Sequence, residues 1–269
     1  LMRLGRRARK SSAGYDLVKL FVGSEGTLGV ITEITLRLYG IPESVVAATC
    51  AFDTLEGAVN TVIQTIQSGI PVARIELMDT YTVDTVNKYS KLTLPQKNLL
   101  LLEFHGTEAS TKEQAEMVQA IASEHGGGDF GWTNQAEERT KMWQARHDAA
   151  WAAKAAKPGW GMWATDVCVP ISRLAECILE TQKDIQANGL YAPIVGHVGD
   201  GNFHLTMMVD PNDPAYLPKA DALNDRMVAR ALALGGTCTG EHGVGIGKIK
   251  FLYAEHGEAM SLMRSIKKA

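Results

Sequence analysis

Two histidines flank a turn signal in the segment GHVGDGNFH, residues 196–204. The dipeptide Asp200-Gly201 is typical of a two-residue hairpin, because both central positions of a type I′ turn need a positive φ. Counting outward from this turn places His197 opposite His204, as a cross-strand pair with Cβ atoms about 4.5–5.5 Å apart. Two imidazoles at that separation can bind one metal ion, although two ordinary histidines beside a turn would give the same pattern.

A later segment, GEHGVGIGK at residues 240–248, adds a carboxylate and a third imidazole. Glu241 with the two earlier histidines would complete an N/N/O metal site that keeps a position open for water or substrate. On an extended backbone His242 points away from Glu241, so that it can act as a general base beside the metal. The sequence therefore predicts zinc or manganese on His197, His204 and Glu241, with His242 as the catalytic base.

Arg146 is a cation on an otherwise apolar face of a helix predicted over residues 135–157. An unpaired guanidinium inside the protein would cost several kcal/mol, so we expect Arg146 to meet an anion. An internal salt bridge, or a side chain that extends to solvent, would satisfy it equally well. Asp166, four residues before Pro170, is interpreted as a carboxylate at the end of a strand rather than as a partner of the metal ligands.

Composition is typical of a globular protein, with 45% hydrophobic and 21% charged residues among 269. The net charge of -3 gives no broad basic field for nucleic acid, and no apolar run is long enough to span a membrane. We expect the four cysteines to be reduced core residues of a cytosol-like compartment, because none forms a CxxC motif.

Strands and amphipathic helices alternate from about residue 44 onward, which predicts an α+β fold whose mostly antiparallel sheet is covered by helices on one face. Before residue 44, two further strands are predicted over residues 17–22 and 30–38. The loop GSEGTLG between them can present backbone N–H groups to an anion or a ring edge, or can be a structural turn.

Taken together, these motifs resemble those of the flavin-linked D-2-hydroxy-acid dehydrogenase family. The resemblance is carried at the end of the chain by GHVGDGNFH and CTGEHGVGIGK, and near its start by GYDLVKLFVGSEGTLGVITEITL, which resembles the end of that family's FAD-binding domain. The motifs most similar to the cytochrome-linked D-lactate dehydrogenase branch are RARKSSAGYD, PVARIELMD, WQARH and TDVCVP.

The resemblance implies a vanillyl-alcohol-oxidase-like architecture. Residues 1–43 would be the end of the FAD-binding lobe, and residues 44–269 a ferredoxin-like cap, the C-terminal domain of FAD-linked oxidases. Because most of the FAD-binding lobe would be missing, we expect a fragment that is inactive alone. The residues implied to touch the flavin are Ser24, Glu25, Gly26, Thr27, Gly29, Ile31 and Asn202.

The resemblance also implies a reaction, in which a D-2-hydroxy acid, D-lactate above all, is oxidised to the 2-oxo acid with metal assistance and a hydride passes to FAD. Arg146 would then bind the substrate carboxylate. Implied partners are the small 2-hydroxy acid, an electron acceptor such as a cytochrome or quinone, and a second copy in a homodimer, in the bacterial cytoplasm, peripheral to its membrane, or in the mitochondrion. The alternatives are oxidation of D-2-hydroxyglutarate or glycolate, a metal hydrolase, and a metal-binding module without enzymatic activity.

Overall fold

A computed structural model describes all 269 residues of the chain. The chain forms two compact units, of which the larger is Ile41–Gly240. The smaller unit combines the two segments Leu1–Gly40 and Glu241–Ala269. The predicted domain boundary at residue 43 stays a prediction. The two compact units divide the chain in another way, because Glu241–Ala269 groups with Leu1–Gly40.

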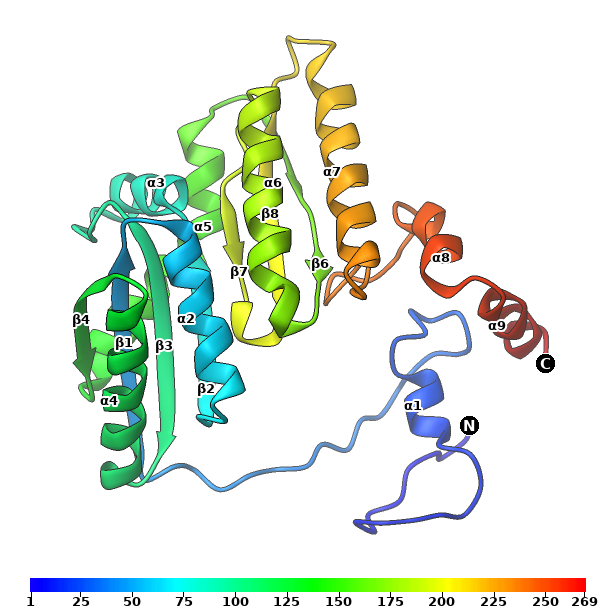
Figure 1. Cartoon of the computed structure of the whole chain (residues 1–269). Coiled ribbons are helices and arrows are strands. Elements are labelled where there is room, and N and C mark those ends of the chain that lie inside the picture. The colour runs from blue at the N-terminus through cyan, green and yellow to red at the C-terminus, as the bar shows by residue number, and fades with distance from the viewer. The chain divides into compact units, whose positions relative to one another are not determined.

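The larger unit is built on one open sheet in which every neighbouring pair of strands is antiparallel. Its order is β4-β1-β3-β2-β7-β8-β5, with β6 paired to β8 (Figure 1). The order β4-β1-β3-β2 is that of a ferredoxin-like βαββαβ unit, so the predicted α+β class and ferredoxin-like cap are both present. The strands are β1 (Ser44–Phe52), β2 (Val72–Met78), β3 (Asn98–Gly106), β4 (Gly127–Thr133), β5 (Gly161–Ala164), β6 (Val167–Cys168), β7 (Ile194–Gly196) and β8 (Asn202–Val209).

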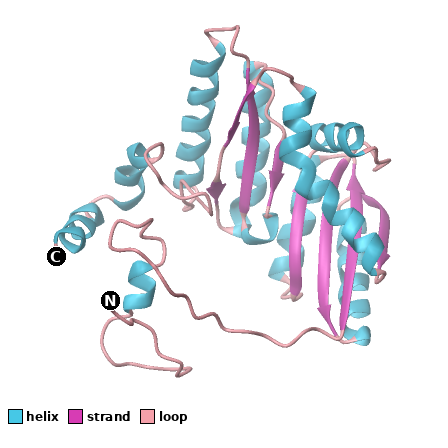
Figure 2. Ribbon diagram, turned by 180° about the vertical axis from the view of Figure 1, so that it is seen from behind, coloured by secondary structure: helices cyan, strands magenta, loops and turns pink.

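Helices cover both faces of this sheet, so the expectation of helices on one face is wrong (Figures 1 and 2). The reason lies in β3, where seven consecutive residues are buried and both alternating sets of side chains therefore need a cover. One face carries α2 (Leu55–Gln67), α4 (Glu108–Glu124), α6 (Leu174–Asn188) and α7 (Tyr216–Ala233). The other face carries α3 (Thr80–Ser90) and α5 (Ala136–Ala156).

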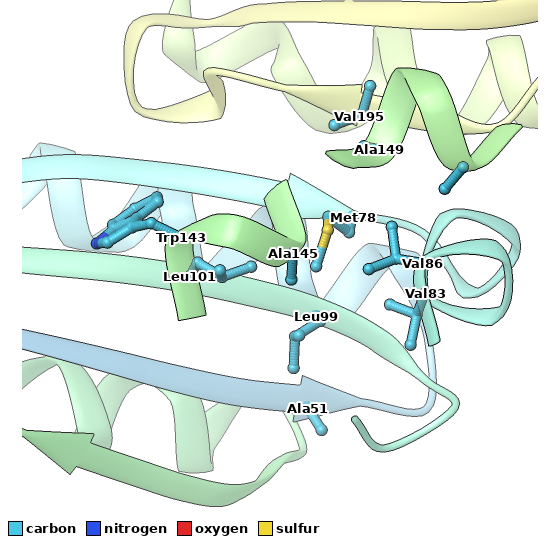
Figure 3. Close-up of a cluster of buried hydrophobic side chains, with 11 residues drawn as sticks. Ala51, Met78, Val83, Val86, Leu99, Leu101, Trp143, Ala145, Ala149 and Val195 are labelled. Atoms are coloured by element: carbon cyan, nitrogen blue, oxygen red, sulfur yellow. The ribbon is translucent and has the colours of Figure 1, made fainter. Parts of the chain in front are cut away.

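The alternation of β3 divides the core into two layers. Leu99 and Leu101 pack with Trp143 and Ala149 of α5 (Figure 3). Leu100 and Leu102 point to the opposite face and are also completely buried. Removing a leucine side chain of this kind from water contributes about 1.5–3 kcal/mol.

Asp79 connects the end of β2 to the start of α3 and to β7. Its carboxylate caps α3 by accepting from Thr82 N at 2.8 Å, and it accepts from Ile194 N, the first residue of β7, at 2.9 Å. Burial raises the pKa of Asp79 to about 6, and the hydrogen bonds from Ile194 and Thr82 oppose that rise. One buried side chain thus aligns β7 with β2.

The smaller unit contains three short helices, α1 (Leu17–Phe21), α8 (Ile249–His256) and α9 (Ala259–Lys268). The predicted strand over residues 17–22 is therefore wrong, because Asp16 caps a helix by accepting from Lys19 N at 3.1 Å. Residues 30–38 are not a strand either. No strand of the described chain lies beside them to share hydrogen bonds, and their apolar side chains are exposed.

None of the helices combines the length and apolar character that crossing a membrane requires. None of the four cysteines forms a disulfide bond; Cys50, Cys177 and Cys238 are buried, whereas Cys168 is partly exposed. Burial raises the pKa of the Cys50 and Cys177 thiols to about 11. These two thiols are therefore protonated and unreactive at neutral pH.

Candidate functional site

The two predicted metal-binding histidines lie close together, but not through the predicted turn. The β7–β8 register pairs Val195 with His204, and His197 lies beyond the end of β7 at φ −80° and ψ 63°. A 3₁₀ turn over Val198–Asp200 follows, and of the proposed central pair only Gly201 has a positive φ, +79°. The type I′ hairpin is therefore wrong, because the connection is longer than two residues. The imidazole centroids are nevertheless 5.7 Å apart, with rings nearly perpendicular.

Glycines at two positions allow this close approach. A Cβ on Gly196 would lie 2.5 Å from Phe203 Cα in the paired strand. A Cβ on Gly201 would lie 2.1 Å from Val169 O, at a φ that favours glycine in any case. The short distance between β7 and β8 therefore depends on the absence of a side chain at Gly196.

His204 is buried, and the residues that link β5 to β6 contact its Nδ1 atom. Its Nδ1 lies 3.0 Å from Thr165 O and 3.6 Å from Asp166 Oδ1. Asp166 is completely buried and accepts from Asn202 Nδ2 and from Thr239 Oγ1, each at 2.7 Å. The interpretation of Asp166 as a mere strand-end carboxylate is therefore wrong, since a fully buried acid needs such donors and stands beside a histidine.

The Nδ1 atom of His197 contacts Glu76, a residue that the sequence does not predict as part of the site. The β2–β7 register pairs Leu77 with Gly196, and one step further along each strand Glu76 and His197 meet. His197 Nδ1 lies 2.5 Å from Glu76 Oε1. The available sequence signal is an acidic residue inside the apolar run Ile75-Glu76-Leu77 of a strand.

Arg146 of α5 reaches the same glutamate. Its Nε donates to Glu76 Oε2 at 2.8 Å, and this is the one protein hydrogen bond of the guanidinium. The internal salt bridge, one of the sequence alternatives, is therefore present, while the terminal Nη donors stay available to a bound anion. Arg146 is mostly buried, with 17% of its side chain exposed, so an anion would meet it largely out of water.

Asn202, predicted to touch a flavin, is buried at the start of β8. Its Nδ2 donates to Asp166 Oδ1 at 2.7 Å and to Val167 O at 2.9 Å. Its Oδ1 is buried without a hydrogen-bond partner, which is uncommon for a folded protein and fits a donor from a bound group. Gly240 packs against the same amide, because a Cβ there would lie 2.1 Å from Asn202 Nδ2.

A cavity of about 120 Å³ borders Glu76 and His197. Arg74, Gly199 and Asp200 also line it. Neither Arg146 nor His204 lines this cavity, so it does not mark the predicted substrate site.

The smaller unit contains the other predicted residues, Glu241 and His242, and the GSEGTLG loop. His242 Nε2 lies 3.7 Å from Glu241 Oε1 on a bent backbone, so the expectation that the two side chains point opposite ways is wrong. In the loop, Glu25 adopts φ 50° and accepts from Val244 N at 2.6 Å and Gly245 N at 2.8 Å. These two backbone hydrogen bonds hold the pKa of Glu25 below its usual range.

The open antiparallel sheet with helices on both faces belongs to a known class of domain. The chain belongs to the family described as FAD linked oxidases, C-terminal domain, whose model matches residues 41–269. Among curated proteins it is 48% identical, over 98% of its length, to a "Probable D-lactate dehydrogenase, mitochondrial" of Danio rerio. It is also 48% identical over its whole length to "D-lactate dehydrogenase [cytochrome], mitochondrial" of Arabidopsis thaliana. The chain spans about half the length of these relatives, 53% and 47%.

Solved structures agree on the fold. A 4-ethylphenol oxidase from Gulosibacter chungangensis matches 87% of the chain and 52% of its own with a TM-score of 0.64 at 13% identity. An alkyldihydroxyacetonephosphate synthase matches 95% of the chain and 48% of its own with a TM-score of 0.63 at 17% identity. The family and the α+β fold predicted from the sequence are thus confirmed.

Proposed function

We propose that the chain is the substrate-binding part of a flavin-dependent D-2-hydroxy-acid dehydrogenase whose substrate is D-lactate. The observation that carries the proposal is a pair of imidazoles 5.7 Å apart, beside an arginine whose terminal donors are available. The two relatives with 48% identity support the choice of acid through the names they bear. Their mitochondrial designation supports the same compartment here.

FAD is the cofactor that the family membership supports. When bound, the flavin supplies the two-electron acceptor of the oxidation. The partnerless Oδ1 of Asn202 offers a hydrogen-bond acceptor to it. The loop around Glu25 offers backbone N–H groups, and its predicted contacts are Ser24, Glu25, Gly26, Thr27, Gly29 and Ile31.

The donors present also fit a divalent metal, zinc or manganese. Both His197 and His204 have Nδ1 next to an oxygen acceptor, and Nε2 of each ring would be the metal-binding atom, with Glu241 as the third ligand. When bound, the metal supplies the positive charge that lowers the pKa of a substrate hydroxyl. His242 would accept the hydroxyl proton.

Arg146 would bind and orient the substrate carboxylate. A guanidinium anchored through Nε keeps two Nη groups in one plane, the geometry that a carboxylate accepts. Glycolate is the second candidate, because a "Glycolate oxidase subunit" of Bacillus subtilis is 32% identical over the whole chain. A cytochrome or quinone would then reoxidise the flavin.

The test follows the absorbance of bound flavin in the complete protein, mixed with D-lactate, L-lactate, glycolate and D-2-hydroxyglutarate. Bleaching should be fastest with D-lactate. Equal bleaching by the two lactate enantiomers, or none by any acid, would contradict the proposal. Metal analysis complements it, since His204→Ala should lose a divalent ion that His105→Ala, at a histidine of β3 paired with Glu103, retains.

A further inference from the structure

We infer that Glu76 is a positioning residue that holds the substrate-binding arginine and a metal-binding histidine to one another. The inference rests on the functions proposed above for Arg146 and His197. It adds Glu76, of which one carboxylate oxygen orients Arg146 and the other orients His197.

Glu76 is buried and contacts both Arg146 and His197. Glu76 Oε2 accepts from Arg146 Nε at 2.8 Å, and Oε1 lies 2.5 Å from His197 Nδ1. The glutamate itself is 5% exposed and extends from the middle of the sheet, so its position is fixed by β2. One fixed carboxylate therefore sets the position of Arg146 relative to His197.

The carboxylate of Glu76 determines which nitrogen of a neutral His197 carries the proton. An ionised glutamate only accepts hydrogen bonds, so the proton of a neutral His197 must be on Nδ1. The lone pair is then on Nε2, the nitrogen directed away from Glu76. A neutral His204 must also carry its proton on Nδ1, because Thr165 O, 3.0 Å from that nitrogen, can only accept a hydrogen bond. Both imidazoles are thus set in the tautomer that binds a metal through Nε2 before any metal arrives.

Glu76 also orients the guanidinium of Arg146. Glu76 engages Nε and leaves both Nη groups, so that the guanidinium plane is fixed while its outer end can meet a carboxylate. A second oxygen of the same glutamate orients His197, so the distance between substrate carboxylate and metal is set by one side chain. This explains why an acid with its hydroxyl next to its carboxylate would suit the site.

The same sheet contains a matched control. Glu103 of β3 also joins an arginine to a histidine, since it accepts from Arg74 Nη2 and lies beside His105 Nε2, each at 2.8 Å. Its side chain is 8% exposed, compared with 6% for Glu76. Glu103→Gln therefore measures what the loss of such a buried charge does to the fold, without removing a hydrogen bond of Arg146 or His197.

The first experiment reads the tautomer of His197 by ¹⁵N chemical shifts in complete, flavin-loaded protein from which metal has been removed by a chelator. We expect a proton on Nδ1 in the wild type. In Glu76→Gln an amide donor can replace the acceptor, and the proton should move to Nε2. A wild-type His197 protonated on Nε2 would overturn the inference, and this measurement needs no variant.

The second experiment measures Mn²⁺ affinity and the steady-state constants for D-lactate. Glu76→Gln should weaken Mn²⁺ binding about 10–100-fold, the usual loss when the partner behind a ligand is changed. It should also raise KM roughly tenfold, as expected when one charge-assisted hydrogen bond to the substrate is misaligned. Glu103→Gln should change neither.

Two outcomes separate the inference from the proposed function. A wild type that binds Mn²⁺ and oxidises D-lactate, with Glu76→Gln unchanged in both, refutes the inference alone. A wild type without activity on any 2-hydroxy acid refutes the proposed function, whereas the tautomer and Mn²⁺ affinity of Glu76→Gln still decide whether Glu76 orients His197.

Discussion

Substitution of Gly196 by alanine tests whether the contact between β7 and β8 positions the two histidines. The new Cβ would lie 2.5 Å from Phe203 Cα and 2.6 Å from Asn202 O, both backbone atoms that cannot rotate away. Non-bonded carbon atoms prefer about 3.5–4.0 Å, so the strands must separate by roughly 1 Å.

Two magnitudes follow from that displacement. Forcing atoms into a packed interior costs about 1–3 kcal/mol, which for a domain of this size lowers Tm by roughly 2–12 °C. His197 directly follows Gly196, and metal–ligand distances tolerate only about 0.2 Å. We therefore expect Gly196→Ala to lose at least about tenfold in Mn²⁺ affinity as well.

The assay combines calorimetry with Mn²⁺ titration, and Gly161→Ala is its control. Gly161 lies on the other side of β8, where a Cβ would be 3.8 Å from Val209 O, an ordinary contact. That variant should keep its Mn²⁺ affinity and lose no stability. If Gly196→Ala and Gly161→Ala were indistinguishable in both measurements, the close approach of β7 and β8 would have no role in the site.

Three further predictions concern the pH dependence, the catalytic pair and the core. Because the pKa of buried Asp79 is raised from 3.8 to about 6, the native state binds its proton more tightly, so this group's contribution to stability should fall by roughly 2–3 kcal/mol as pH rises from about 4 to above 6. Asp79→Asn should flatten that slope in denaturant unfolding. His242→Ala should slow flavin reduction by D-lactate ~10²–10⁴-fold in stopped-flow measurements with metal retained, whereas Glu241→Ala should lose the metal too. The assignment fails if the two variants behave in the opposite way. Leu101→Ala in the core layer against α5 should cost about 2–5 kcal/mol in the free energy of unfolding, and a value near zero would contradict the packing described.

The fold was accessible from the sequence where periodicity and burial agree. The helix predicted over residues 135–157 is present as α5, within one residue at each end. The strand predicted over residues 30–38 failed because an alternating pattern shows only that a strand could form. Whether it does depends on a neighbouring strand, which is a property of tertiary structure.

The sequence predicts that His197 and His204 lie close together, but it predicts this from a two-residue turn that the structure does not contain. His197 and His204 lie together, although register and turn differ from the count outward from Asp200. The sequence does not predict Glu76, because its contact with His197 arises from the β2–β7 pairing, which joins residues more than a hundred positions apart. Asp166 was interpreted only as a carboxylate at a strand end, since its complete burial cannot be predicted from its neighbours in the sequence.

The composition of the smaller unit has a consequence for the order of events during synthesis. Its segments Leu1–Gly40 and Glu241–Ala269 are separated by the 200 residues of the larger unit. At ~5–20 residues per second, a ribosome needs about 10–40 s to make that intervening stretch. During this delay Glu25 has no Val244 or Gly245 amide to accept from. The larger unit can fold first, whereas the smaller one assembles only when its last helices have left the ribosome.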